Sequence, residues 1–357
     1  MFWNFAISLG RDSLWRSVKY GELFMSLVSY IEYLRNGLEE LLKSDLDVQL
    51  FGEDIAEPYG GAFKVTKGLS LEFPDRVIQT PMSEQGFTGM AVGMALAGMK
   101  PIVEIMFGDF STLIADQIIN HASKFVWLYK KPMNMVIRAP MGGYRGYGAT
   151  HSQSLERLFF GQPHTLVIAP SVLNNPGRLL INSVYEGVPV IFVENKLDYA
   201  RRFIEHTENY QDLEINTLGI FFPTTEVKIV GFDESELTII TYGGLTQLAL
   251  ELQWKFMLEE EIPIKLLCPS KISPIDEKAL LEFTKNDKKI LILEEGYKKF
   301  GWGSEVSRIL YQAEPSRRIR HIGAKSEFIG ASQILEDCVL PNTDNIDAVM
   351  REMVGSL

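Results

Sequence analysis

The sequence predicts an α/β fold in which parallel strands alternate with helices in two successive domains. Its 357 residues are enough for two domains of roughly 150 residues each. Short apolar runs alternate with stretches of helical period, which is typical of a parallel sheet covered by helices on both faces. Between residues 199 and 236 the composition becomes polar and irregular, and a second alternating unit follows.

These features predict where the domains begin and end. We expect a first domain over residues 25–205 and a smaller α/β domain over 234–357, joined by a linker over 206–233 that contains one hairpin. Residues 1–24 are aromatic-rich and weakly patterned, and they lack the order of a secretory signal. We interpret them as an extension that the fold does not need, or as a helper segment at an interface.

The individual elements follow from apolar spacing. The first helix, over 25–43, is amphipathic because its apolar residues recur every three or four positions. Apolar runs rich in Val and Ile predict strands at 48–52, 76–80, 101–107, 134–138, 165–169 and 188–194. Helices are expected at 67–73, 86–98 and 111–129, with Ser111 as the N-cap of the last, and between the final two strands. The second domain has predicted strands at 237–242, 264–267 and 289–294, and predicted helices at 246–261, 276–284 and 302–310.

Charge and cysteine content exclude several classes of protein. The net charge of -11 argues against a nucleic-acid-binding protein, which needs a basic face to neutralise phosphates. Cys268 and Cys338 stand in unrelated contexts, so they predict neither a disulfide framework nor a metal site, and a reducing cytoplasm is the expected compartment. No apolar run reaches about 18 residues, so we expect no membrane-spanning segment.

The stretch from Thr80 to Phe110 organises the rest of the chain. Glu84 stands between a predicted strand and a helix rich in Gly and Ala, in which each interior Gly costs about 1 kcal/mol relative to Ala. Small residues are kept on a helix where another helix, another subunit or a flat cofactor approaches its backbone. The following strand ends in Met106 and Phe107 and turns at Phe110. This arrangement predicts a pocket for a ring, with one acid in it.

Two interpretations of Glu84 stay open on these grounds. A carboxylate at the beginning of a helix is explained by the helix dipole alone. Alternatively, Glu84 is an acid in a dry pocket, where burial raises its pKa so that it shares a proton with a ligand nitrogen.

A glycine-rich loop over 140–148 leads to His151. The loop has neither the dinucleotide-binding spacing nor the Lys-Ser/Thr ending of a P-loop. His151 is either a structural residue or, given its place after a flexible loop, a general acid–base group. Arg145 is either solvated or holds a substrate carboxylate or phosphate. Because ligands of parallel sheets bind at the carboxyl ends of the strands, we expect Glu53, Glu84, residues 106–110 and this loop to converge on one crevice.

Together these motifs resemble a known family. The order FGEDIAEPYGGAFKVTKGL, TPMSEQGFTGMAVGMALAGMKPIVEIMFGDF, ADQIINHASK, GATHSQS, ILEEG and FGWGSEV is similar to that of the beta subunit of the thiamine-diphosphate-dependent 2-oxo acid dehydrogenases, in the transketolase superfamily. The resemblance covers residues 25–340, nearly the whole chain. It implies a pyrimidine-binding domain followed by a transketolase C-terminal domain, and a 2-oxo acid as substrate.

The resemblance also implies roles for individual residues. Glu84 matches the acid that hydrogen-bonds the aminopyrimidine ring of thiamine diphosphate, and His151 matches the histidine that assists acyl transfer after decarboxylation. The remaining matches are with residues that line the ring pocket: Glu53 as a second carboxylate, and Met82, Met106 and Phe110 as packing groups.

One half of the family's cofactor site is missing from the sequence. The Gly-Asp-Gly motif that holds the divalent cation and the diphosphate does not occur, and no dedicated metal site is expected in this chain. The resemblance therefore implies an alpha subunit that supplies the diphosphate and Mg²⁺ site in an α2β2 assembly. It also implies a lipoyl acyltransferase core as a candidate partner.

Departures from the family leave the acceptor open. Arg145 and Tyr147 stand in the loop where the family more often has small residues. An alternative is therefore a transketolase-like or acyloin-forming enzyme, which passes its fragment to a sugar or a small metabolite. A non-catalytic scaffold subunit is a third hypothesis, against which Glu84 and His151 argue.

Overall fold

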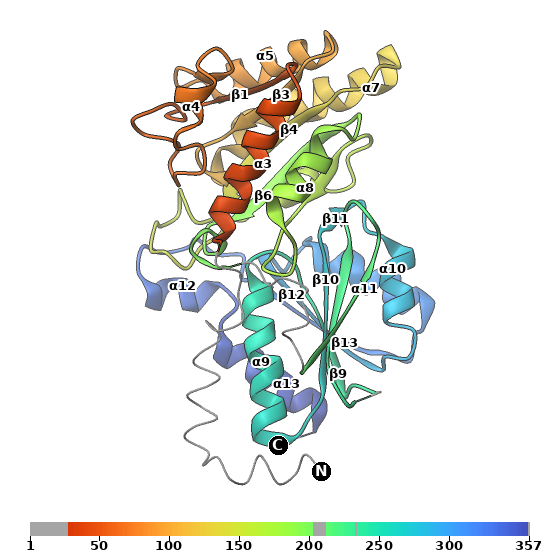
Figure 1. The fold of residues 1–357 in the computed structure, drawn as a ribbon. Coiled ribbons are helices and arrows are strands. Elements are labelled where there is room, and N and C mark those ends of the chain that lie inside the picture. Colours follow the sequence, from red (N-terminus) through yellow and green to blue (C-terminus); the bar gives the residue numbers. More distant parts are fainter. Residues whose placement is uncertain (1–27, 203–211, 233, 356–357) are drawn as a thin grey trace.

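The computed structural model describes residues 28–202, 212–232 and 234–355, which form two α/β domains. The first domain, coloured red to green in Figure 1, lies above the second, coloured cyan to blue. Residues 1–24, predicted as an extension, lie outside the described residues. The domain limits predicted from the sequence stay a prediction.

A seven-stranded sheet forms the first domain, in the order β11-β5-β6-β4-β3-β1-β2. Its strands are β1 (Val48–Gly52), β2 (Val77–Gln79), β3 (Lys100–Glu104), β4 (Met135–Met141), β5 (Leu166–Ile168), β6 (Pro189–Asn195) and β11 (Lys271–Ser273). All neighbours are parallel except β11, which pairs antiparallel with β5. The parallel sheet predicted from the alternating pattern is confirmed.

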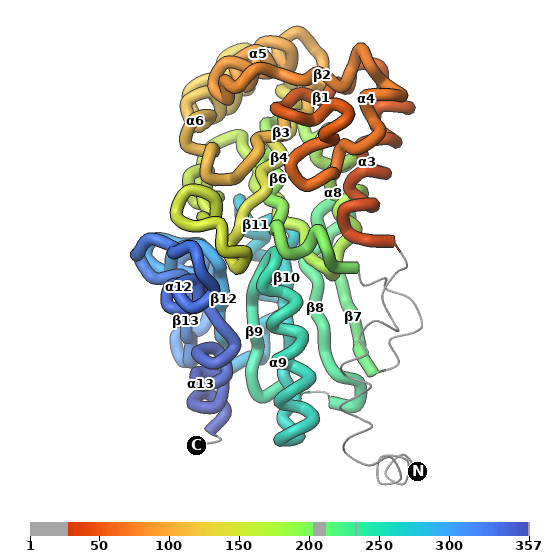
Figure 2. Tube along the Cα trace, turned by 90° about the vertical axis from the view of Figure 1, so that its left-hand side faces the viewer, coloured from red at the N-terminus to blue at the C-terminus, as the bar shows by residue number. Residues whose placement is uncertain are grey.

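Helices cover both faces of this sheet, as Figure 2 shows. On one face lie α3 (Tyr30–Ser44) and α8 (Pro176–Val184), with Leu34, Leu38 and Leu180 buried against the strands. The two helices cross so closely that a Cβ on Gly37 would lie 2.7 Å from the Cα of Gly177. On the opposite face lie α5 (Glu84–Leu96), α6 (Ser111–Asp116) and α7 (Ser123–Tyr129).

The predicted helix over 111–129 forms, but it is not one regular helix. A π-helical stretch, Gln117–Ala122, separates α6 from α7. The prediction that Ser111 is the N-cap is wrong, because the helix continues from the short 3₁₀ turn Gly108–Phe110. The Ser111 hydroxyl is buried and has no hydrogen-bond partner among the described residues. β3 is shorter than predicted, since its pairing with β4 ends at Glu104 opposite Arg138.

The second domain is a six-stranded sheet in the order β13-β12-β9-β10-β8-β7. Its strands are β7 (Leu213–Leu218), β8 (Thr224–Ile229), β9 (Leu237–Ile240), β10 (Ile264–Pro269), β12 (Lys289–Tyr297) and β13 (Arg318–Ala324). β7 and β8 form an antiparallel hairpin, so the stretch predicted as a linker, 206–233, contributes two strands to this sheet. β7 is an edge strand without a fully buried residue, so its polar composition resembles that of a loop, whereas β8 lies between β10 and β7 and is almost entirely buried.

Helices also cover the second sheet on both sides (Figure 1). They are α9 (Leu245–Glu260) and α13 (Thr343–Val354) on one side and α10 (Glu277–Phe283) and α11 (Trp302–Ala313) on the other, while α4 (Leu69–Glu72) and α12 (Gln333–Val339) are short connecting helices. One apolar cluster joins the domains, since Ala169 and Ile191 of the first belong to the same core as Ile240 and Leu267 of the second.

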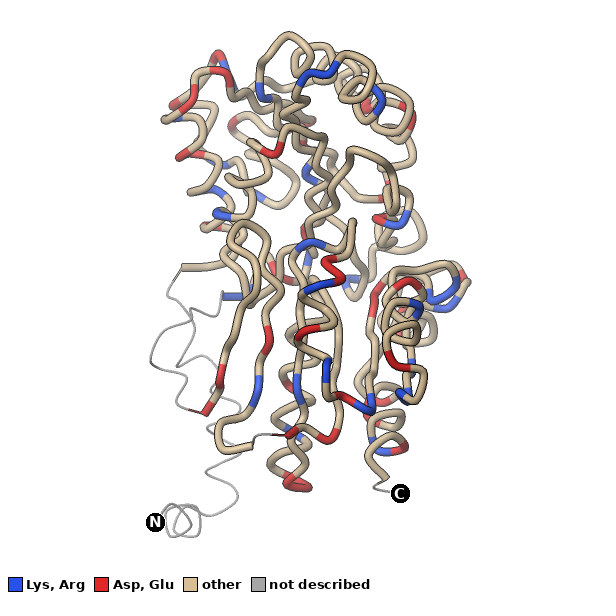
Figure 3. The backbone as a smooth tube through the Cα atoms, turned by 90° about the vertical axis from the view of Figure 1, so that its right-hand side faces the viewer, with Lys and Arg blue, Asp and Glu red and all other residues tan. Residues whose placement is uncertain are grey.

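Acidic and basic residues are interspersed along the backbone of both domains, as the colours in Figure 3 show. None of the helices in the described ranges combines the length and the apolar character that crossing a bilayer requires.

Candidate active site

Two buried carboxylates mark the carboxyl edge of the first sheet. Glu53 directly follows β1, and Glu84 is the first residue of α5; each side chain is 8 % exposed. Burial, the nearby Glu84 charge and Asp54 together raise the pKa of Glu53. Its Oε1 atom is buried and has no hydrogen-bond partner within the described part of the chain. Because buried polar atoms are almost always paired, this oxygen points to a missing donor.

An aromatic wall lies at the ends of β3 and β4, the neighbouring strands. The imidazole of His151 meets Phe107 edge-on, with ring centroids 4.5 Å apart, and Phe110 at 5.9 Å. Phe107 and Phe110 contact each other at 6.1 Å. The hydroxyl of Thr150 lies 2.8 Å from Nδ1 of His151. The structure thus brings two of the predicted residues, Phe110 and His151, into contact.

The two predicted methionines differ in their surroundings. Met106, between β3 and the Gly108–Phe110 turn, is half-buried, whereas the side chain of Met82 is 83 % exposed. The Met82 side chain therefore makes few contacts with the described part of this chain. Its predicted contact with a ring would require another surface to cover it.

The glycine-rich loop is held mainly by the second domain. The N–H of Gly143 donates to Oε1 of Glu295 at 2.6 Å, and that of Gly146 donates to Glu336 of α12 at 3.1 Å. The Tyr144 hydroxyl donates to the carbonyl of Pro341 at 2.7 Å. Gly142 has a φ of +100°, and a Cβ there would lie 2.8 Å from Oε1 of Glu295, so this position requires glycine.

Arg145 is bound within the first domain. Its Nη1 donates to the carbonyl oxygen of Lys196 at 3.0 Å, and its guanidinium lies 5.4 Å from the ring centroid of Tyr147. Arg145 is therefore close to the aromatic wall that contains His151. Among the described residues, no carboxylate lies within ion-pairing distance of its guanidinium.

Lys196 and Asp109 are two further polar residues of this edge. Lys196 is not among the residues predicted from the sequence, and Asp109 lies within the predicted stretch 106–110 but was given no role of its own. Lys196 follows β6 and is fully buried, and burial lowers its pKa to about 8. Asp109 is 7 % exposed; its Oδ1 accepts from Gln153 at 2.8 Å, and its Oδ2 is buried with no partner among the residues that the structure describes. Both follow strand ends, so the same rule that selected Glu53 also selects them.

A buried ion-pair network lies beneath the site. Nε and Nη2 of Arg138 bind the two carboxylate oxygens of Glu194 at 2.7 Å, and Nη1 binds Glu104. All three side chains are buried, and the Tyr199 hydroxyl donates to Glu194. Because each charge is paired, this network fixes β3, β4 and β6 relative to one another.

Acidic residues also gather where the two domains meet. Glu156 accepts a hydrogen bond from the Tyr242 hydroxyl, and burial raises its pKa to about 7, with Glu294 and Glu295 adding to the increase. A cavity of about 20 Å³ beside Glu156, Asn195 and Glu295 has room for about one water molecule.

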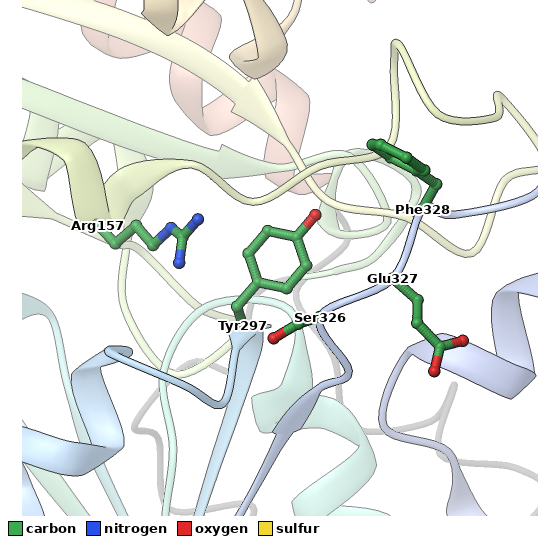
Figure 4. A pocket seen from close by; sticks show the side chains of 5 residues that line it. All are labelled: Arg157, Tyr297, Ser326, Glu327 and Phe328. Atoms are coloured by element: carbon green, nitrogen blue, oxygen red, sulfur yellow. The ribbon is translucent and has the colours of Figure 1, made fainter.

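A separate cleft of about 510 Å³ opens on the surface between Arg157, Tyr297 and residues 326–328. Figure 4 shows the Arg157 guanidinium beside the Tyr297 ring, 4.6 Å from its centroid. None of the predicted site residues lines this cleft, so it is distinct from the edge that carries Glu53 and Glu84. No group of three or more His, Cys, Asp or Glu side chains in the described ranges is arranged to hold a metal ion.

Comparisons with known proteins define the class. Residues 26–202 match the family described as "Transketolase, pyrimidine binding domain", and residues 226–346 match "Transketolase, C-terminal domain". A solved structure described as "Split gene transketolase, inactive beta4 tetramer" superposes with a TM-score of 0.68, covering 92% of this chain and 99% of that one. At 20% identity this likeness shows the fold alone. The fold is therefore that of a transketolase-type protein.

Curated relatives narrow the class to a family. The chain is 31% identical to the pyruvate dehydrogenase E1 component subunit beta of Saccharomyces cerevisiae, over 91% of this chain and 88% of that protein. It is 30% identical to the 2-oxoisovalerate dehydrogenase subunit beta of Bacillus subtilis, over 92% and 99%. The chain belongs to the family of the E1 beta subunits of the thiamine-diphosphate-dependent 2-oxo acid dehydrogenases. The family and fold predicted from the sequence are confirmed.

Proposed function

We propose that this chain is the beta subunit of a thiamine-diphosphate-dependent 2-oxo acid dehydrogenase and supplies the aminopyrimidine half of a shared active site. The observation that carries the proposal is the pair of buried carboxylates, Glu53 and Glu84, at the sheet edge that also carries the aromatic wall of Phe107, Phe110 and His151. Family membership supports the same reading.

The residues at this edge fit an aminopyrimidine. The buried Oε1 of Glu53 is an acceptor to which no described residue donates, and Glu84 is an acid of equal burial whose charge acts on it. A ring that carries an amino group and a nitrogen able to hold a proton would satisfy two such carboxylates. When bound, thiamine diphosphate supplies the electron sink for decarboxylation. Glu84 would share a proton with the ring nitrogen, while Met82, Met106 and Phe110 would pack on the ring.

His151 and Arg145 would act on the substrate side. The His151 imidazole, held by Thr150 and two phenylalanine rings, would move a proton during acyl transfer. Arg145 would hold the carboxylate of the 2-oxo acid. The acetyl-transferring type of this reaction, with a lipoyl acyltransferase core as acceptor, is our preferred assignment.

The diphosphate end needs a second subunit. Mg²⁺ takes oxygen ligands and the diphosphate, and the sequence has no Gly-Asp-Gly motif to provide them. An alpha subunit in an α2β2 assembly would hold both, and the exposed Met82 would become buried at that contact. We place the assembly in the cytoplasm, in keeping with only two cysteines.

Reconstitution with candidate alpha subunits tests the proposal. We expect 2-oxo acid decarboxylation only from the pair, in the presence of thiamine diphosphate and Mg²⁺. Glu84→Gln in the pair should lose at least about 100-fold in kcat, since it removes the proton partner. Glu277→Gln is the matched control, because Glu277 is also the first residue of a helix but is exposed. Turnover by this chain alone, or full activity of the Glu84→Gln pair, would overturn the proposal.

Arg145 favours one alternative function. A guanidinium in the loop beside His151 would equally suit a phosphorylated sugar, as in a transketolase-like or acyloin-forming enzyme. The reconstituted pair should therefore be given lipoamide and aldose acceptors side by side. Transfer to the aldose but not to lipoamide would establish this alternative.

A further inference from the structure

Lys196 is a buried cation without an ion-pair partner. Its side chain is fully buried, and none of the described carboxylates lies within ion-pairing distance of its Nζ. An unpaired buried charge is costly, so the groups that surround it must compensate. Those groups are the carbonyl oxygen of His151, which accepts a hydrogen bond from Nζ, and the rings of Phe107 and Tyr147, whose centroids lie 5.3 and 5.4 Å away. Both ring distances are within the range of a cation–π interaction.

These compensating groups belong to the wall that holds His151. Phe107 contacts the His151 imidazole at 4.5 Å and the Tyr147 ring at 6.1 Å. The Lys196 ammonium therefore binds the backbone of His151 and lies over two rings: that of Phe107, which contacts the imidazole, and that of Tyr147, which contacts Phe107. More distant charges act on it as well: Asp109, Glu295 and Glu336 favour the ammonium, and Arg145 disfavours it.

Lys196 also binds the glycine-rich loop at three points along its length. Its backbone N–H donates to the carbonyl of Met141, the last residue of β4, at 3.0 Å. Its backbone carbonyl accepts from Arg145 in the middle, and its Nζ donates to His151 at the end. A loop with positive φ at Gly142, Gly146 and Gly148 has no regular hydrogen bonding of its own, so such external contacts determine its shape.

We propose that Lys196 is the positioning residue for His151, and that its ammonium charge sets the place and orientation of the imidazole at the half-site. The role in turnover rests on the proposed function, whereas the effect on the imidazole does not. Loss of the charge removes the attraction to both rings, and loss of the donor frees the carbonyl oxygen of His151.

The first test uses the full-length chain without cofactor or partner. Histidine is labelled with ¹³C, and the signal of His151 is identified by its loss in His151→Gln. In Lys196→Met we expect the His151 signal to shift or broaden while the signals of the other four histidines stay in place. Lys196→Arg, which keeps the charge, should restore much of the wild-type position.

A second buried lysine provides the matched control. Lys265 also donates its ammonium to a backbone carbonyl, that of Phe283, but it lies in the second domain. Lys265→Met should therefore lower stability without moving the His151 signal. If Lys196→Met does not fold, Lys196→Gln, which keeps an N–H donor without the charge, replaces it. An unchanged His151 signal in the folded uncharged variant would overturn the proposal.

The second test uses the reconstituted pair. Lys196→Met should lower kcat about ten-fold through the misplaced acid–base group and leave KM for the 2-oxo acid within about two-fold. Recovery of kcat by Lys196→Arg is expected. One combined outcome separates the two proposals. If the His151 signal shifts in Lys196→Met but the wild-type pair has no thiamine-dependent activity, the proposed function is overturned and the positioning role stands.

Discussion

The backbone N–H of Gly143 donates a hydrogen bond of 2.6 Å to Oε1 of Glu295, across 152 residues of sequence and from one domain to the other. The second oxygen of the same carboxylate accepts from Asn195 at 2.7 Å, at the end of β6. One buried side chain of the second domain thus holds the beginning of the loop that carries His151.

Removing this side chain should destabilise the protein. Glu295→Ala leaves two buried donors without acceptors, and we expect a loss of about 1–3 kcal/mol in the free energy of unfolding. Urea denaturation measures it. Glu295→Gln keeps an oxygen for Gly143 and should lose less; an equal loss in both variants would mean that the hydrogen bond to Gly143 contributes little.

The Arg138 network should be more sensitive still. Arg138→Met leaves the buried carboxylates of Glu104 and Glu194 without their cation, and breaking such a pair from one side typically costs about 3–5 kcal/mol. The exposed pair of Arg178 and Glu40 offers the control, since Arg178→Met should change stability by less than about 1 kcal/mol. Equal denaturation midpoints for the two variants would contradict this.

Glu156 should make stability depend on pH. Its pKa is raised to about 7 in the folded chain, mainly by burial, so the folded state binds the proton more tightly than the unfolded state. The stabilisation from protonated Glu156 is complete below the unfolded pKa and is lost as the pH rises through about 7. One pKa unit corresponds to about 1.4 kcal/mol, so the loss is roughly 3 kcal/mol.

Glu156→Gln removes this titration and keeps an oxygen for the Tyr242 hydroxyl. Relative to wild type, the variant should therefore gain stability between about pH 4.5 and pH 8. Urea denaturation at both pH values measures the difference in unfolding free energy between the variant and the wild type. The contributions of the other titrating groups cancel in this difference. A difference that does not change with pH would show that folding does not raise the pKa of Glu156.

Two glycines in helices should respond to alanine in opposite ways. Gly177, in α8, faces α3, and a Cβ there would lie 2.1 Å from the carbonyl oxygen of Tyr33, so Gly177→Ala should be strongly destabilising. Gly93, in α5, is open: apart from the backbone of its own helix, no atom of the described residues lies within 4 Å of its ideal Cβ. Gly93→Ala should therefore stabilise the isolated chain by up to about 1 kcal/mol.

The same substitution tests whether α5 packs against another subunit. Gly86, Met90, Gly93 and Ala97 form an exposed stripe on α5. If a partner covers that stripe, Gly93→Ala should weaken assembly in analytical ultracentrifugation while raising the melting temperature of the free chain. Unchanged assembly would show that the stripe remains exposed.

Much of the fold could be predicted because periodicity reports burial directly. The six parallel strands of the first sheet and their helices follow from apolar runs at strand and helix spacing, and the strand-end rule selected Glu53 and Glu84. β11 could not be found in this way, because three residues carry no period and its partner β5 lies about 100 residues away. The π-helical stretch Gln117–Ala122 was missed for a related reason, since one wider turn leaves the apolar spacing nearly unchanged.

Contacts that shape the site were harder to predict than the site's location. The bonds from Glu295 to Gly143 and from Lys196 to His151 join residues far apart in sequence, and neither leaves a local pattern. The position of Lys196 directly after a buried strand is the one signal in the sequence that points to this residue. From the sequence alone, a lysine at this position is expected to be exposed to solvent. It is buried only because residues 142–151 fold back over it.

β11 has a consequence for the order in which the protein is made. The first sheet has an open edge at β5 until residues 271–273 have left the ribosome, and strands β7 to β10 of the second domain precede these residues in the chain. Until then β5 presents unpaired backbone groups to other chains, which is the usual starting point of aggregation. The two domains thus follow one another in sequence, but the first does not complete its sheet alone. The edge of its sheet at β5 is covered only when β11, which lies within the second domain's sequence, has been made.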